Sequence, residues 1–122
     1  MPIDLTRALA IHGFMDEAEL RWLAEQAATR SAIVEVGSWL GRSARALADH
    51  FPGIIYCVDD WRGPEGLPAE LAAHQLTSAD AFLRFQENLR EHLDSGRIFP
   101  LMVGSPDAAA DTCAVIRTRL SV

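Results

Sequence analysis

The sequence contains no lysine, and all eleven of its basic residues are arginines, against seventeen acidic residues. The resulting formal net charge of -6 argues against non-specific binding to nucleic acid or to an anionic membrane surface. Arginine is the better bidentate clamp for carboxylates, but so complete a bias is more typical of genome composition than of chemistry. No apolar run reaches the length of a membrane span, and the N-terminus lacks the apolar core of a signal peptide. We therefore expect a cytoplasmic protein.

Cysteine and metal-ligand patterns are also scarce. Cys57 and Cys113 stand in apolar surroundings without metal-ligand spacing, so we interpret both as buried thiols in a reducing compartment. The four histidines are scattered without ligand spacing, which disfavours a metal site. His74 lies in a segment expected to cover the candidate pocket, and it is the one histidine to test as a catalytic base.

The chain is long enough for one domain, since 122 residues bury roughly two-thirds of their unfolded surface in a single core. Short apolar runs predict three strands, at residues 31–36, 53–60 and 97–104. Helical periodicity predicts helices at residues 15–29, 42–51, 77–95 and 106–122. Residues 61–76 combine prolines and glycines without clear periodicity, so we expect an irregular surface segment there.

The predicted helices carry recognisable ends. The first begins with a capping-box pattern, in which Asp16 is followed three residues later by Glu19. Gly96 is placed to end the third. The apolar positions expected to face the core recur at helical spacing: Leu20, Leu23, Ala24, Ala27, Ala44, Leu47, Ala48, Phe82, Phe85, Leu89 and Leu93. Arg42 and Arg45, in the first turns of the second helix, are expected to be solvated.

Strands that alternate with helices and are apolar on both faces indicate parallel strands covered on both sides. Right-handed crossovers then give the spatial order 3-2-1. We therefore predict an α/β fold, a three-layer Rossmann-like half-domain with helices on both faces of its sheet. In this single domain, residues 1–30 form an N-terminal helical segment, 31–105 a β-α-β-α-β unit and 106–122 a C-terminal helix. Pro100 indicates a bend or an unpaired position in the third strand.

The loop at residues 37–41 is the expected ligand site, because the carboxyl end of a strand meets a helix N-terminus there. Gly37 and Gly41 permit a sharp turn and a close approach of the backbone to a ligand. Asp59 follows Gly37 by 22 residues, near the spacing of about 20 expected for an acid that binds a ribose. Gly104 and Ser105 end the third strand. The sequence therefore predicts a nucleoside site.

Two common nucleotide motifs are absent. The dinucleotide fingerprint needs a second glycine where the backbone touches a pyrophosphate, and Trp39 occupies that position. The chain also has no G-x-x-x-x-G-K-[ST] phosphate loop. A nicotinamide or flavin dehydrogenase module is thereby disfavoured.

The stretches EVGSWLGRS at 35–43 and YCVDDWRG at 56–63 resemble the first two motifs of class I S-adenosylmethionine-dependent methyltransferases. Within that family they are most similar to bacterial small-molecule or sugar O-methyltransferases, and the resemblance covers roughly residues 15–105. It implies S-adenosylmethionine, or its product S-adenosylhomocysteine, as cofactor and a small hydroxyl-bearing molecule as methyl acceptor. Because this cofactor has a carboxylate, an ammonium and a sulfonium but no pyrophosphate, the bulky Trp39 is tolerable.

The resemblance also implies roles for individual residues. Glu35 would oppose the ammonium group, while amides of residues 37–43 would meet the carboxylate. Asp59 would bind the ribose hydroxyls. Asp60 and Trp61 would flank the adenosine.

Gly104 and Ser105 would lie near the adenine edge, although the family often has an acidic or amide residue after that glycine. The full set of expected cofactor-binding residues is Glu35, Gly37, Ser38, Trp39, Gly41, Ser43, Asp59, Asp60, Trp61, Gly104 and Ser105. Two alternatives stay open, since Trp39 could instead cover the edge of the core and Asp60 could instead form a turn.

The resemblance also indicates what is missing. Methyltransferases of this family continue with further strands that supply acceptor-site and metal-binding residues, and none is predicted after the third strand. We therefore expect one chain alone to methylate poorly. The first strand would be left as an uncovered apolar edge, which predicts a homodimer formed across that strand or by exchange of the C-terminal helix. The alternatives are a non-catalytic cofactor-binding or oligomerisation module, and a truncated copy of a longer enzyme.

Overall fold

The computed structural model of the 122-residue chain describes residues 2–62 and 78–103. Its elements are, in order, α1 (Thr6–Leu9), α2 (Glu17–Ala27), β1 (Ile33–Val36), α3 (Arg42–Ala48), β2 (Ile55–Asp59), α5 (Ser78–Asn88), α6 (Arg90–Asp94) and β3 (Ile98–Met102). The predictions that concern His74, Gly104, Ser105, Cys113 and a helix at 106–122 lie outside the described residues.

The three strands form one all-parallel sheet with β2 in the middle. Glu35 of β1 pairs with Cys57 of β2, and Asp59 at the end of β2 pairs with Met102 of β3. The carboxyl ends of the strands therefore share one edge of the sheet, where the loop at 37–41 follows β1. The predicted α/β class with parallel strands is confirmed.

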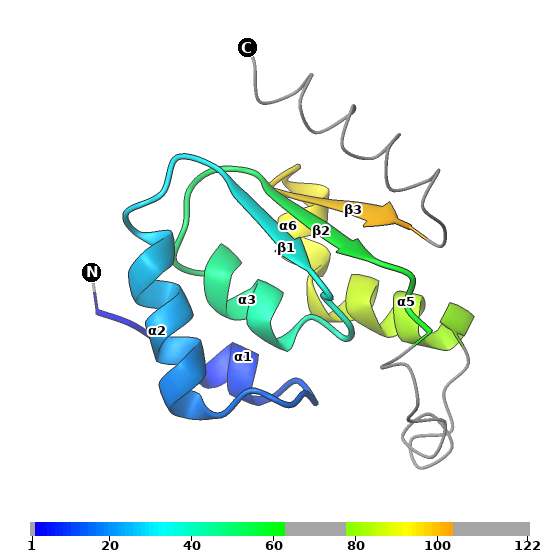
Figure 1. Ribbon diagram of the computed structural model, residues 1–122, viewed down its shortest axis with the longest axis horizontal. Helices are drawn as coiled ribbons and strands as arrows, with labels where there is room; N and C mark the ends of the chain where they lie inside the picture. The colour runs from blue at the N-terminus through cyan, green and yellow to red at the C-terminus, as the bar shows by residue number, and fades with distance from the viewer. Residues whose placement is uncertain (1, 63–77, 104–122) are drawn as a thin grey trace.

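The described helices lie together on one side of the sheet (Figure 1). Both crossovers, from β1 to β2 and from β2 to β3, advance in the same direction, and right-handed crossovers then place their helices on the same face. The main cluster of buried side chains, which includes Leu47, Cys57 and Phe85, fills the space between sheet and helices. The helix expected to cover the opposite face, at residues 106–122, is outside the described part of the chain.

The N-terminal end of α2 forms as the sequence predicts. A carboxylate oxygen of Asp16 accepts a hydrogen bond from the Glu19 backbone N–H (2.8 Å), and the Glu19 side chain accepts one from the Asp16 N–H (3.2 Å). Leu20 and Ala24 of this helix are buried together with Ala46 of α3. The predicted capping box is confirmed, and α2 packs against the helix that follows the glycine loop.

The third predicted helix is divided into α5 and α6. Leu89 stands at the break with φ -122° and ψ 20°. The Asn88 carbonyl accepts a hydrogen bond from Nη1 of Arg45 (3.2 Å), and the His92 N–H bonds instead to the Leu89 carbonyl (3.0 Å). Apolar spacing alone does not reveal this break, because the apolar face continues through it. Gly96, with φ 75°, follows the second helix as expected.

Both outer strands of the described sheet have open edges, and the two edges differ. Arg97 and Val103 flank β3, and the Arg97 carbonyl and the Val103 N–H both bond to β2. By alternation the nitrogen of Pro100 faces outward and needs no partner. In β1, Val34 and Val36 are 43% and 81% exposed, and as alternate residues they share the sheet face that points away from the core. The open edge of β1 carries no proline, so it can pair with another strand more readily than the edge of β3.

Candidate functional site

Two glycines shape the loop between β1 and α3. Gly37 has φ 88° and Gly41 has φ 99°, in the left-handed region that glycine enters without steric cost. Gly41 also packs closely, because a Cβ atom there would lie 2.9 Å from Cδ1 of Leu89. At Gly37 nothing lies within 4 Å of the corresponding position. Gly41 is thus required for both conformation and packing, and Gly37 for conformation alone.

Two tryptophans also have left-handed backbones, which is uncommon for bulky residues. Trp39 has φ 48° and Trp61 has φ 57°. The Asp59 carboxylate holds both, because Oδ2 accepts a hydrogen bond from the Trp39 N–H (2.7 Å) and Oδ1 accepts one from the Trp61 N–H (3.0 Å). Asp59 therefore ties the loop after β1 to the loop after β2. Each carboxylate oxygen has a second lone pair, so Asp59 can still accept from a ligand hydroxyl.

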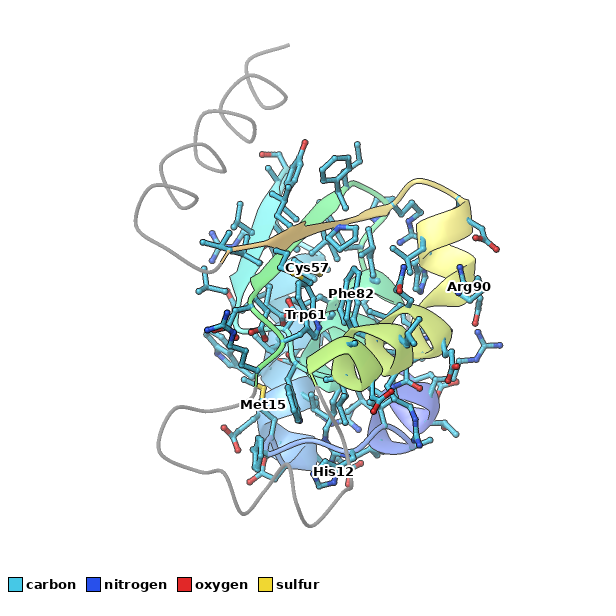
Figure 2. All side chains as sticks on the ribbon, turned by 90° about the vertical axis from the view of Figure 1, so that its right-hand side faces the viewer. His12, Met15, Cys57, Trp61, Phe82 and Arg90 are labelled. Carbon is cyan, nitrogen blue, oxygen red and sulfur yellow. The ribbon has the colours of Figure 1, made fainter. Side chains whose placement is uncertain are left out.

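Trp61 supports the loop from inside the core. Its side chain is fully buried, with ring centroids 4.7 Å from Phe82 and 5.0 Å from Phe85. Figure 2 shows Trp61 and Phe82 side by side beneath the sheet. The indole Nε1–H donates to the Trp39 carbonyl (2.7 Å). In this conformation Trp61 offers no surface to an adenosine, and its effect on a ligand would pass through Trp39.

Glu35 brings a carboxyl group under the loop. Burial raises its pKa, the nearby hydroxyls of Ser43 and Ser38 act in the opposite direction, and the negative charge of Asp59 adds to the increase. Three polar atoms here are buried without a hydrogen-bond partner among the described residues, namely Glu35 Oε1, Ser38 Oγ and Trp39 Nε1. The Ser38 hydroxyl is therefore close enough to influence Glu35 but not aligned for a regular hydrogen bond. Buried polar atoms without partners are rare and mark candidate ligand contacts.

Two further residues of the motifs have plain local roles. An oxygen of Asp60 accepts a hydrogen bond from the Arg62 N–H (2.9 Å), which agrees with the turn-forming alternative for this residue. Cys57 is buried beneath the loop, and burial raises the pKa of its thiol, so the predicted buried thiol is confirmed at this position.

The prediction that Arg42 is solvated is wrong. Its guanidinium donates three hydrogen bonds to backbone carbonyls, at Met15 (2.8 Å), Ile11 (2.8 Å) and Leu9 (3.1 Å). Gly13 makes room for it, since a Cβ atom there would lie 2.6 Å from Cδ of Arg42. Arg42 thus fastens the N-terminal segment to the first turn of α3, immediately after the glycine loop.

The prediction that Arg45 is solvated is also wrong, since this residue is only 3% exposed. Its guanidinium pairs with Asp49 (3.1 Å) and Glu91 (2.8 Å), and the contact with Arg45 holds the pKa of Glu91 below its usual range. His92 contacts the other oxygen of Asp49 (2.8 Å). The i,i+4 spacing of Arg45 and Asp49 was the one available sequence signal for this network.

A cavity of about 940 Å³ lies elsewhere in the molecule. It is lined by Ile3, Asp4, His50 and Phe51 among others, together with Arg97, which immediately precedes β3. These residues lie toward the amino ends of the strands, away from the loop at 37–41. Ligands of open α/β sheets bind at the carboxyl ends, so the volume of this cavity does not identify it as the candidate site.

Comparisons with known proteins assign no family to this chain, so a proposal about its function depends on the geometry of the site. The chain matches no protein-family model, and no curated protein matches it significantly in sequence. Among residues 2–62 and 78–103, no cluster of three or more histidine, cysteine or acidic side chains could hold a metal ion. Over the same residues, no helix is both long and apolar enough to cross a membrane.

Proposed function

We propose that this chain binds S-adenosylmethionine, or S-adenosylhomocysteine, at the loop of residues 37–41. It would act as the cofactor-binding half of a class I methyltransferase-like domain with Rossmann-like topology and strand order 3-2-1. The observation that carries the proposal is the buried, unpartnered Oε1 atom of Glu35 beneath a glycine loop. That loop is fixed by the acid at the end of the next strand, Asp59.

The chemistry of these groups fits the ligand. A buried carboxyl oxygen without a partner is stabilised by a donor group, and the ammonium of the cofactor is such a donor. Asp59 retains acceptor capacity for ribose hydroxyls after binding two backbone amides. Trp39 stands where the dinucleotide fingerprint needs a glycine that touches a pyrophosphate, which favours a cofactor without one. Its side chain is buried in the core, in agreement with the alternative that it covers the edge of the core.

When bound, the cofactor would supply an electrophilic sulfonium methyl group for displacement by an acceptor hydroxyl. The contribution of this chain is to hold the cofactor in a fixed orientation, which lowers the barrier by positioning. Glu35 and Asp59 would hold its two ends, and the loop between them would set its depth. No described residue is assigned as the base that removes the acceptor proton.

The proposal is tested by thermal unfolding with S-adenosylhomocysteine, adenosine or NAD as ligand. At 100 times its dissociation constant, a bound ligand raises the free energy of unfolding by about 2.7 kcal/mol. We expect stabilisation by S-adenosylhomocysteine, a weaker effect of adenosine and none of NAD. Stabilisation by NAD alone would exclude the proposal. Binding without methyl transfer to any hydroxyl acceptor would identify a non-catalytic cofactor-binding module.

The matched substitutions Glu35→Gln and Glu17→Gln each remove one carboxyl group. Comparing them distinguishes a contact between Glu35 and the ligand from a general effect of the change in net charge. Glu17 lies exposed in the first turn of α2, with a side chain 63% exposed. Only Glu35→Gln should weaken binding of S-adenosylhomocysteine, while adenosine, which has no ammonium group, should bind both variants alike. Equal loss for the two ligands would place Glu35 away from the ammonium.

A further inference from the structure

We propose that Asn88 is a positioning residue that holds the loop of residues 37–41 in its ligand-binding conformation through the carbonyl group of Leu40. Asn88 is the last residue of α5, and its side-chain Nδ2 donates a hydrogen bond of 2.8 Å to that carbonyl. The two residues are 48 positions apart in the chain. The effect of Asn88 on cofactor affinity rests on the proposed function. Its effect on the conformation of the loop rests on this contact alone.

The loop is fixed through its carbonyl groups. All four carbonyls of residues 38–41 accept hydrogen bonds. Two of these bonds come from the loop itself and from α3. The other two come from side chains beyond β2, since Trp61 donates to the Trp39 carbonyl and Asn88 donates to the Leu40 carbonyl. Asn88 therefore joins the loop backbone to α5 by a hydrogen bond.

Asn88 is itself held in place. Its backbone carbonyl accepts a hydrogen bond from Nη1 of Arg45 (3.2 Å). The guanidinium of Arg45 is fixed by Asp49 and by Glu91. Because the Asn88 carbonyl bonds sideways to α3, the regular helix ends at this residue and α6 begins after Leu89. The break thus places a side-chain amide beside the loop.

Packing at the same junction leaves the loop little freedom. Gly41 lies so close to Leu89 and Phe85 that an added Cβ atom would be 2.9 Å from one and 3.4 Å from the other. If Asn88 lost its donor, the part-buried Leu40 carbonyl would have no partner in this tight space. An unpaired buried acceptor is costly, and we expect affinity for a ligand of the ordered loop to fall roughly tenfold.

The experiment uses two substitutions that differ in the donor. Asn88→Asp keeps the shape of the side chain and replaces the donor by an acceptor. Asn88→His restores a donor, because its Nδ1 atom stands at the same position in the side chain as the amide nitrogen. Gln86→Ala is the control, since Gln86 is a half-buried amide of the same helix without a hydrogen bond in the described residues.

Two measurements report the ligand affinity and the order of the loop. Titration with S-adenosylhomocysteine gives affinity, and acrylamide quenching of tryptophan fluorescence gives loop order without any ligand. Trp22 is 58% exposed, so it is replaced by phenylalanine in every variant and in the reference protein. The fluorescence then comes from the buried Trp39 and Trp61. We expect Asn88→Asp to increase quenching and weaken binding, and Asn88→His to return both toward the values of the control.

The inference is overturned if Asn88→Asp matches the control in quenching and affinity, even with a lower melting temperature. It is also overturned if folded Asn88→His shows a loosened loop. Should Asn88→Asp fail to fold by circular dichroism, the histidine variant decides alone. Absence of S-adenosylhomocysteine binding to the unmodified protein would refute the proposed function, and the quenching comparison would then decide the role of Asn88 separately.

Discussion

Replacing Asp59 by alanine removes the hydrogen-bond acceptor that holds the left-handed backbones of Trp39 and Trp61. We therefore predict a larger loss in the free energy of unfolding than the replacement of a residue at a strand end normally causes. The carboxylate accepts from the Trp39 N–H at 2.7 Å and from the Trp61 N–H at 3.0 Å. Hydrogen bonds to a charged group contribute about 1.5–3 kcal/mol each. Because Asp59 is only half-buried, the lower figure applies, which gives about 3 kcal/mol for the pair.

Relaxation of the loop reduces that loss. A left-handed conformation costs roughly 1–2 kcal/mol in a non-glycine residue, and a released loop regains part of it at Trp39 and Trp61. We therefore expect a net loss of about 2 kcal/mol in the free energy of unfolding, a large share of the 5–15 kcal/mol typical of a domain. Asp59→Asn should lose less, since its remaining carbonyl oxygen can accept from one of the two amides.

Urea unfolding of Asp59→Ala beside Asp60→Ala provides the assay. Asp60 is the neighbouring acid, and its bond to the Arg62 N–H is exposed, so its removal should cost less than about 1 kcal/mol. Acrylamide quenching should rise in the Asp59 variant alone. The reasoning is refuted if the two variants unfold at the same urea concentration with unchanged quenching.

The remaining predictions concern the glycines and the buried charges. In urea unfolding, Gly37→Ala should lower the free energy of unfolding by about 1 kcal/mol because of its backbone conformation. Gly41→Ala should lower it by about 2–4 kcal/mol, because its Cβ atom would also clash with Leu89. Equal losses would contradict the close packing at Gly41. Burial raises the pKa of Glu35 above its unfolded value near 4.5, so the folded state favours the protonated carboxyl. The free energy of unfolding should therefore fall as the pH rises from about 4.5 toward the raised pKa of the folded state. Glu35→Gln should remove this component in unfolding measured from about pH 5 to 8, and an unchanged slope would place the carboxyl in solvent. Arg45→Met should cost about 3 kcal/mol because the Asp49 carboxylate keeps only His92 as a partner among the described residues, and Arg45→Lys should restore part of this loss. A fully stable methionine variant would contradict the buried network.

Local sequence signals predicted the features that depend on near neighbours. The capping box of Asp16 and Glu19 and the left-handed Gly96 each involve residues within one helical turn. Strands β1 and β2 were likewise visible as short apolar runs. Such features need no knowledge of what packs against them, so a single sequence suffices.

Long-range partners explain what the sequence did not reveal. Arg45 was expected in solvent, but its partner Glu91 is 46 positions away in the chain. The helix break at Leu89 accompanies a hydrogen bond from the same guanidinium to the Asn88 carbonyl. A weak signal was present at Asn88, because asparagine is a poor helix former whose side chain often bonds to backbone groups. It indicates a special position but not the carbonyl that the side chain binds.

The motif residues show a second limit of sequence reasoning. Asp59 and Trp61 were selected as ligand contacts from their position after β2. The structure shows that both also hold the loop, Asp59 through two backbone amides and Trp61 from within the core. An acid or an aromatic residue at a strand end serves either use equally well, so the residue type alone does not separate them.

A calorimetric titration of the purified chain with S-adenosylhomocysteine tests the central claim most directly. We predict saturable binding close to one ligand per chain, with affinity reduced in Glu35→Gln and in Asp59→Ala but retained in Asp60→Ala. No heat of binding at millimolar ligand, from protein that is folded by circular dichroism, would contradict the claim that this loop is a cofactor site.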